Sequence, residues 1–233
     1  MSIADNLKNI RERIAAAALR AGRDPASVRL VAVSKTQSAE LVDEAARCGQ
    51  LLFGENYVQE FTAKAATVTA PVEWHFIGHL QSNKVKYLAG GVGMVHSVDR
   101  LSLAQEIDRQ WGRLGKVCDI LVQVNIACEA SKGGTTTDEL RELVGAVSRL
   151  PGLRVQGLMT MPPFFDDPEG ARPYFRELKR LAGVLDAEGI DGVEMSELSM
   201  GMSGDFEVAI EEGATLVRVG SAIFGERQYG WKG

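Results

Sequence analysis

Short apolar runs rich in β-branched residues alternate with longer amphipathic stretches along the whole chain. The longer stretches repeat apolar residues at three- and four-residue spacing, which is typical of helices, whereas the short runs are typical of buried strands. We expect strands at residues 28–34, 51–53, 73–77, 93–98, 117–125, 153–158, 193–198 and 215–219. We expect helices at residues 3–21, 39–48, 55–66, 80–89, 100–112, 137–149, 168–187 and 204–212.

This alternation predicts a parallel sheet, because parallel strands need crossover helices and strands covered on both faces are continuously apolar. Eight such units in 233 residues match a single (β/α)8 TIM-type barrel, for which about 250 residues are typical, here with an extra N-terminal helix. A doubly wound open sheet is the alternative arrangement of the same elements. No Pro/Ser-rich linker or change in composition divides the chain, so we interpret residues 1–233 as one domain.

The composition is that of an ordinary globular protein, with 45% hydrophobic and 24% charged residues. The net charge of −5 argues against a general nucleic-acid-binding protein or one that binds anionic membranes. No apolar stretch approaches the roughly 20 residues that span a bilayer, and charged residues interrupt the N-terminal stretch, so we expect neither a membrane span nor a signal peptide. Three cysteines without a CxxC motif indicate reduced thiols in a cytoplasmic protein.

The first candidate for chemistry lies at the end of the first expected strand. In a (β/α)8 barrel, ligands bind where the strands end, and phosphates favour the loops after strands 7 and 8. Lys35 follows the apolar run 30–33 and Ser34. Desolvation at such a position lowers the pKa of an amine and makes its nitrogen nucleophilic toward a carbonyl. The alternative interpretation is a surface lysine at a strand end.

The loops after strands 7 and 8 carry features of a phosphate site. Ser203 lies in a glycine-rich loop as the expected N-cap of the next helix, whose free N–H groups favour an anion. Gly220 and Ser221 follow the last strand and offer further donors. Arg218 interrupts that strand's apolar run, and alternation points it the same way as Gly220, toward the mouth. The simpler interpretations are a helix cap for Ser203 and a structural ion pair for Arg218.

The expected strand ends bring together an amine, a phosphate site and an arginine. This combination suits a ligand that has both an aldehyde and a phosphate. Pyridoxal 5′-phosphate (PLP) is such a compound, because it forms a Schiff base with a lysine and the protein must also hold its phosphate and its pyridine nitrogen. We expect no metal site, since His75 and His79 lack the glutamate of an HExxH motif.

Seven segments span nearly the whole chain and carry a resemblance to a known family. They are VAVSKT, FGENYVQE, EWHFIGHLQSNK, VNIACEASKGG, GLMTM, LSMGMSGDFEVAI and VRVGSAIFGER. In these segments, and in their order, the sequence resembles the pyridoxal phosphate homeostasis protein family, which is alanine racemase N-terminal-domain-like. The resemblance implies a PLP-bound barrel of the type seen in alanine racemase (PLP fold type III). Thr36-Gln37-Ser38 departs from the lysine and proline that relatives often carry there, which affects the stiffness of the loop.

The resemblance also implies a role for each candidate residue. Lys35 would carry PLP as a Schiff base, and Arg218 would face the pyridine nitrogen. The remaining cofactor-binding candidates are Ser203, Gly220 and Ser221 at the phosphate, Ser199 as a weaker phosphate candidate, Asn56 and His79 near strand ends, and Lys132 as a second lysine that takes up or passes on PLP.

The function expected from these residues is cofactor handling. A guanidinium stays charged and only donates hydrogen bonds, so a pyridine nitrogen that faces Arg218 stays unprotonated and PLP is a weaker electron sink. The chain ends at Gly233 without the C-terminal β-domain that supplies a racemase's second base. We therefore expect a monomeric, non-catalytic protein of vitamin B6 homeostasis that buffers PLP or delivers it to PLP-dependent apo-enzymes. The alternatives are a small amino-acid racemase with Lys35 as one base, and a cofactor-free interaction protein.

Overall fold

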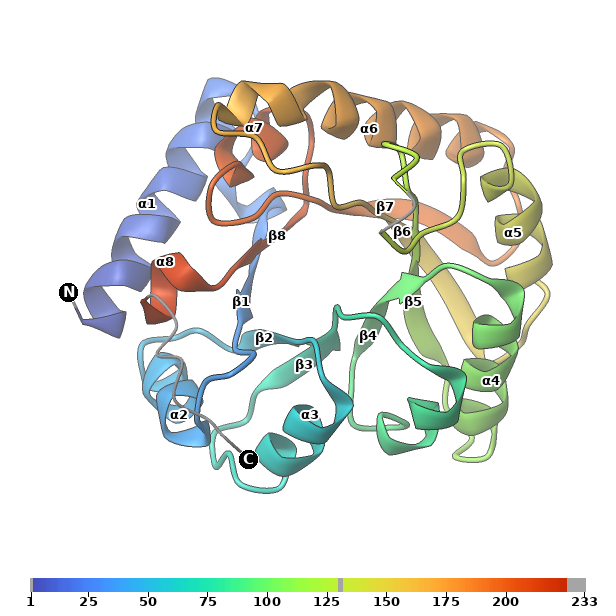
Figure 1. Ribbon diagram of the computed structural model, residues 1–233, viewed down its shortest axis with the longest axis horizontal. Coiled ribbons are helices and arrows are strands. Elements are labelled where there is room, and N and C mark those ends of the chain that lie inside the picture. Colours follow the sequence, from blue (N-terminus) through green and yellow to red (C-terminus); the bar gives the residue numbers. More distant parts are fainter. Residues whose placement is uncertain (1, 130–131, 226–233) are drawn as a thin grey trace.

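The computed structural model describes residues 2–129 and 132–225, and eight parallel strands form a closed barrel in it (Figure 1). Each strand pairs with its neighbours in sequence, and β1 pairs with β8 to close the ring. The strands are β1 (Arg29–Val33), β2 (Leu52–Glu55), β3 (Glu73–Phe76), β4 (Met94–Val98), β5 (Cys118–Gln123), β6 (Leu153–Met159), β7 (Val193–Ser199) and β8 (Leu216–Val219). The predicted barrel is confirmed, and the open sheet is wrong.

The helices surround the barrel on its outside (Figure 1). They are α1 (Ile3–Arg20), α2 (Ala39–Arg47), α3 (Val58–Ala65), α4 (Leu101–Gly112), α5 (Leu140–Val147), α6 (Arg172–Ala187), α7 (Phe206–Glu211) and α8 (Ser221–Phe224). The additional N-terminal helix α1 packs against α7 and α8, and Asn6 Nδ2 donates a hydrogen bond of 2.8 Å to the Ile223 carbonyl. The extra helix therefore covers the seam where β8 meets β1. None of the described helices is long and apolar enough to cross a membrane.

Two predicted helices have a different form. Residues 80–89 contain the 3-10 helix η2 (Ser82–Tyr87) rather than an α-helix. Its N-cap, Gln81, makes no side-chain capping bond, and the glycines at 90 and 91 follow closely, so little holds a longer α-helix there. The helix expected at 168–187 begins with a 3-10 turn, η3 (Pro168–Ala171), before α6 starts.

The start of α7 also differs from the prediction. The N-cap is Asp205, and Ser203 lies two residues before it. Asp205 Oδ1 accepts a hydrogen bond of 2.6 Å from the Met202 N–H, which closes the glycine-rich loop ahead of the helix. The expectation that Ser203 caps this helix is therefore wrong, and its hydroxyl is turned toward the next strand end instead.

The apolar core lies on both sides of the barrel wall. The larger part fills the space between the strands and the helices. A smaller cluster lies inside the barrel and consists of Val31, Met94, Leu121, Met159 and Leu216. Because successive side chains of a strand face opposite sides, residues two positions along from these also face inward. The inward positions nearer the carboxyl ends of the strands carry the polar groups of the site.

Candidate functional site

A cavity of about 520 Å³ opens at the carboxyl ends of the strands. Its lining includes residues that follow β1, β2, β7 and β8, which the closed barrel brings to one end. Six of the nine candidate residues line it: Lys35, Asn56, Ser203, Arg218, Gly220 and Ser221. The structure therefore brings these distant segments of the sequence together at one cavity, and the cofactor role of each residue stays a prediction.

Lys35 lies two residues beyond Val33, the last residue of β1, and alternation places it on the inner side of the barrel with Val31. The next residue, Thr36, has a positive φ of 64°, an uncommon conformation for a residue other than glycine. The Thr36 N–H donates a hydrogen bond of 2.7 Å to Glu60 Oε2. The chain therefore turns sharply just after Lys35, and a carboxylate on α3 holds the turn.

An ion-pair cluster of Glu55, Glu60 and Lys64 lies behind this turn, between β2 and α3. Lys64 Nζ donates to Glu55 Oε1 at 2.7 Å, to Glu60 Oε2 at 3.1 Å and to the Ser34 carbonyl at 2.5 Å. Ser34 Oγ donates to the same Glu55 oxygen at 2.7 Å. Burial raises the pKa of Glu55, although Lys64 and the hydroxyl of Ser34 act against it. The cluster thus fixes the backbone on both sides of Lys35.

The phosphate candidates form a small polar group beside the end of β1, because β8 pairs with β1. Ser203 Oγ lies 3.4 Å from the Gly220 nitrogen, which donates to it, and 3.3 Å from Ser221 Oγ. A Cβ at Gly220 would lie 3.2 Å from the Val33 carbonyl oxygen, tighter than most such contacts, so glycine suits this position. Burial raises the pKa of the neighbouring Asp205 carboxyl. Two hydroxyls and a backbone N–H therefore meet where an anion would be held.

Arg218 projects from β8 into the barrel and forms part of the cavity wall. It is almost fully buried, and burial lowers its pKa to about 10, so it stays charged at neutral pH. Its Nη1 donates to Ser199 Oγ at 2.5 Å, and its Nη2 donates to the Thr160 carbonyl at 2.9 Å. These two bonds hold the guanidinium from β7 and from the end of β6.

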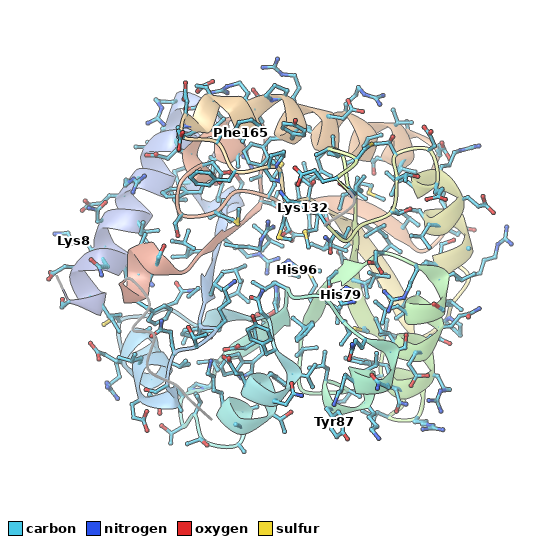
Figure 2. The ribbon with its side chains drawn as sticks, viewed as in Figure 1. Lys8, His79, Tyr87, His96, Lys132 and Phe165 are labelled. Carbon is cyan, nitrogen blue, oxygen red and sulfur yellow. The ribbon has the colours of Figure 1, made fainter. Side chains whose placement is uncertain are left out.

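Three candidates lie outside the cavity lining. Ser199 is fully buried beside Arg218, where it contacts the guanidinium instead of the mouth. His79 is exposed, and Lys132 Nζ donates a hydrogen bond of 2.7 Å to the Pro162 carbonyl. Figure 2 shows both residues on the inner side of the ring of helices. The structure therefore brings none of the three into direct contact with the cavity, and their cofactor roles stay predictions.

Sequence reasoning missed the polar interior and the two phenylalanines of the cavity wall. His96 on β4 lies inside the ring of strands (Figure 2), and its Nδ1 lies 2.9 Å from Ser199 Oγ. A histidine two residues after an inward-facing methionine in a buried strand is the signal that could have found it. Met161, Phe164 and Phe165 from the loop after β6 also line the cavity. Among the described residues no group of three His, Cys, Asp or Glu side chains could hold a metal.

The cavity contains the groups that PLP requires. Lys35 offers an amine, and Arg218 offers a cation. Ser203, Gly220 and Ser221 offer hydroxyls and N–H groups. The buried Asn56 Oδ1 has no hydrogen-bond partner among the described atoms, which suits a ligand donor at that point. Apolar side chains line the cavity wall beside these polar groups, and such a wall suits the planar pyridine ring of PLP. The residues present therefore fit this cofactor.

Comparison with known proteins places the chain in a family. The family model described as "Alanine racemase, N-terminal domain" matches residues 5–228. A relative from Aquifex aeolicus, named pyridoxal phosphate homeostasis protein, is 47% identical over 230 residues, 98% of this chain and 100% of the relative. The chain belongs to this family. A family member of the same name from Escherichia coli K12 is 42% identical, with 99% of both chains covered.

Solved structures agree with this family assignment. PipY of Synechococcus elongatus, solved with PLP bound, has a TM-score of 0.82 at 35% identity and covers 96% of this chain and 100% of its own. The alanine racemase of Clostridium difficile has a TM-score of 0.73 at 15% identity and is covered over 57% of its length. The second likeness shows that the two proteins share the barrel fold.

Proposed function

We propose that this protein binds PLP at the mouth of its barrel and acts in vitamin B6 homeostasis by buffering PLP or delivering it. The observation that carries the proposal is the convergence of Lys35, Arg218 and the Ser203 loop on one cavity. The relatives named for PLP homeostasis and the PLP-bound PipY support it. PLP-dependent apo-enzymes as acceptors, a monomeric state and a cytoplasmic location stay predictions, and the free cysteines of the described chain fit a reducing compartment.

When bound, PLP would supply an aldehyde that a lysine nitrogen takes up with loss of water, a phosphate and a pyridine nitrogen. Lys35 would offer its nitrogen to the aldehyde. Ser203, Gly220 and Ser221 would hold the phosphate through their hydroxyls and N–H groups. Arg218 would direct its charge at the ring nitrogen and keep that nitrogen unprotonated.

A carrier suits this cavity better than a racemase does. Racemisation at an amino-acid carbon needs a base on each face of the substrate, and Lys35 can act on one face. The described lining residues include no tyrosine, histidine or cysteine that would serve as the second base. Asp205 lies on the phosphate side and already accepts a hydrogen bond from the Met202 N–H. We therefore propose that the protein holds PLP without turnover.

The decisive experiment is visible absorption of the purified protein with added PLP, followed by borohydride reduction and peptide mapping. We expect reduction to fix PLP on Lys35, and Lys35→Ala to lose both the absorption band and the adduct. Lys64→Arg keeps a cation in the neighbouring cluster and is the matched control, since it should keep the adduct on Lys35. Equal labelling of Lys35→Ala would overturn the assignment of the site.

Two further assays separate the alternatives. An amino-acid racemisation assay with the PLP-loaded protein should show no activity, and measurable turnover would favour the racemase. Transfer to a PLP-dependent apo-enzyme should occur faster than PLP dissociates freely from the protein. If PLP reaches the apo-enzyme no faster than it dissociates freely, the protein buffers PLP and does not deliver it.

A further inference from the structure

A line of hydrogen-bonded side chains crosses the barrel interior from the cavity to the opposite end. Ser199 Oγ, which accepts from Arg218, lies 2.9 Å from His96 Nδ1. His96 Nε2 lies 2.8 Å from His75 Nδ1, and His75 Nε2 lies 2.9 Å from Glu73 Oε1. Both imidazoles are buried, whereas the Glu73 side chain is 53% exposed. We call Glu73, His75, His96 and Ser199 the relay.

The two ends of the relay determine the direction of its hydrogen bonds. A guanidinium only donates, and an ionised carboxylate only accepts. The hydrogen bond from His75 lowers the pKa of Glu73, so the carboxylate is ionised and His75 Nε2 carries a proton. Burial, with the nearby charge of Arg218, holds the pKa of His96 well below its ordinary value, so His96 is neutral and one of its ring nitrogens accepts. Because His75 Nε2 donates to Glu73, His75 Nδ1 is the nitrogen that can accept from His96 Nε2, and Ser199 then donates to His96 Nδ1.

We propose that the hydrogen bonds of the relay run in one direction, from Ser199 through His96 and His75 to Glu73, and that Glu73, His75 and His96 are positioning residues for Arg218. His96 then carries its single proton on Nε2, because its Nδ1 accepts from the hydroxyl of Ser199.

The relay reaches the cofactor side through one atom. Ser199 Oγ accepts from Arg218, and its proton points away toward His96. The Thr160 carbonyl is the second anchor of Arg218 and lies outside the relay. The guanidinium at the cavity wall is therefore held by groups that extend to the far end of the barrel.

The relay is reached by solvent at its far end. Glu73 lines a second cavity, of about 420 Å³, together with Arg29 and Gln50. The other charged groups that act on the relay are Arg29, which pairs with Glu197 at 2.7 Å, and Asp205, which acts on Arg218 from the mouth. Neither Arg29 nor Asp205 hydrogen-bonds to either relay histidine among the described contacts.

The first test uses the protein without PLP. The chain has three histidines, so nitrogen-15 correlation spectra of the imidazoles can be assigned with single substitutions. We expect a neutral His96 that carries its proton on Nε2. A His96 that carries its proton on Nδ1 would reverse the direction of the relay and overturn the proposal.

The second test uses PLP affinity. His96→Leu should weaken PLP binding about tenfold, because Ser199 loses its acceptor and Arg218 its fixed anchor. His96→Gln can accept from Ser199 and donate to His75, so it should keep the affinity within about twofold. Wild-type affinity in both variants would show that the relay does not act on the site, and an equal loss in both would overturn the positioning role of its hydrogen bonds.

The inference rests on the proposed function only in the second test, which takes Arg218 as a cofactor contact. Ser97→Ala is the matched control there, since Ser97 follows His96 on β4 and its buried Oγ has no hydrogen-bond partner among the described atoms. Ser97→Ala should keep the affinity. If the protein binds no PLP, the proposed function fails, and the spectra of the unloaded protein still decide the direction of the relay.

Discussion

Two buried polar clusters support the candidate site from opposite sides of the barrel wall. The ion-pair cluster lies outside the wall, between β2 and α3, and balances Lys64 against the carboxylates of Glu55 and Glu60. The relay lies inside the wall, and its two buried members from β3 and β4 are imidazoles. The first cluster is made of full charges, and the second has charged groups at its ends.

The difference follows from what each position can reach. A helix that packs on the outside of a barrel can bring a side chain of opposite charge to a strand, as α3 brings Lys64 to Glu55 nine residues earlier. Inside the barrel only strand side chains are present, so a fixed charge there needs partners from other strands. Arg218 contacts a hydroxyl and a carbonyl, and two imidazole rings continue the line of hydrogen bonds to Glu73. We infer that the outer cluster determines stability and that the inner one tunes the site.

Breaking the ion-pair cluster should have the largest effect on stability. Lys64→Met removes the cation and leaves Glu55 buried without its partner. A broken buried ion pair costs about 3–5 kcal/mol, so we expect a loss of about 3 kcal/mol in the free energy of unfolding at neutral pH. Urea denaturation followed by circular dichroism measures it. The double variant Lys64→Met with Glu55→Met should recover most of the loss, and a double variant as unstable as the single one would contradict this account.

The same variant has a predicted pH dependence. Burial raises the pKa of Glu55, so the folded state favours the protonated carboxyl more than the unfolded state does. Its contribution to stability is therefore fully present below the ordinary glutamate pKa and is lost as the pH rises through the raised value. Without Lys64 the pKa rises further, so the cost of Lys64→Met should fall by about half on acidification. A cost that is constant across pH would show that Glu55 is not the group left unpaired.

The sequence supports the prediction of the barrel and of part of the site, and the two clusters show where prediction stops. Strand periodicity and strand-end position suffice to identify Lys35, Ser203 and Arg218 as candidates, because the fold places strand ends together. Which side chains meet inside the barrel depends on the register between β3, β4, β7 and β8, which periodicity does not determine. The prediction that Ser203 caps α7 is wrong because the loop closes through a hydrogen bond from the Met202 N–H to Asp205. Periodicity does not determine this contact either.

The relay should have the second-largest effect, and a pair of buried serines tests it. Ser199→Ala leaves a charged N–H of Arg218 and the His96 ring nitrogen without a partner. An unsatisfied buried group costs about 1–3 kcal/mol, so we expect a loss of about 2 kcal/mol. Ser97→Ala removes a hydroxyl that has no partner among the described atoms and should change stability by about 0.5 kcal/mol or less. Thermal unfolding of both variants at one pH compares their stabilities. Equal losses of stability would show that the hydrogen bonds of Ser199 contribute no more than the unpartnered hydroxyl of Ser97.

The smallest effect on stability should come from Glu60, which belongs to the ion-pair cluster but is partly exposed, with 30% of its side chain accessible. Glu60→Gln keeps an oxygen for the Thr36 N–H and removes the charge that faces Lys64. Exposed and partly exposed ion pairs contribute about 0–1 kcal/mol, so unfolding should change by less than about 1 kcal/mol. Glu60→Ala also removes the acceptor that holds the turn after Lys35. If the cluster positions Lys35, only Glu60→Ala should release PLP faster in stopped-flow absorption, whereas equal release from both variants would confine the cluster to a stabilising role.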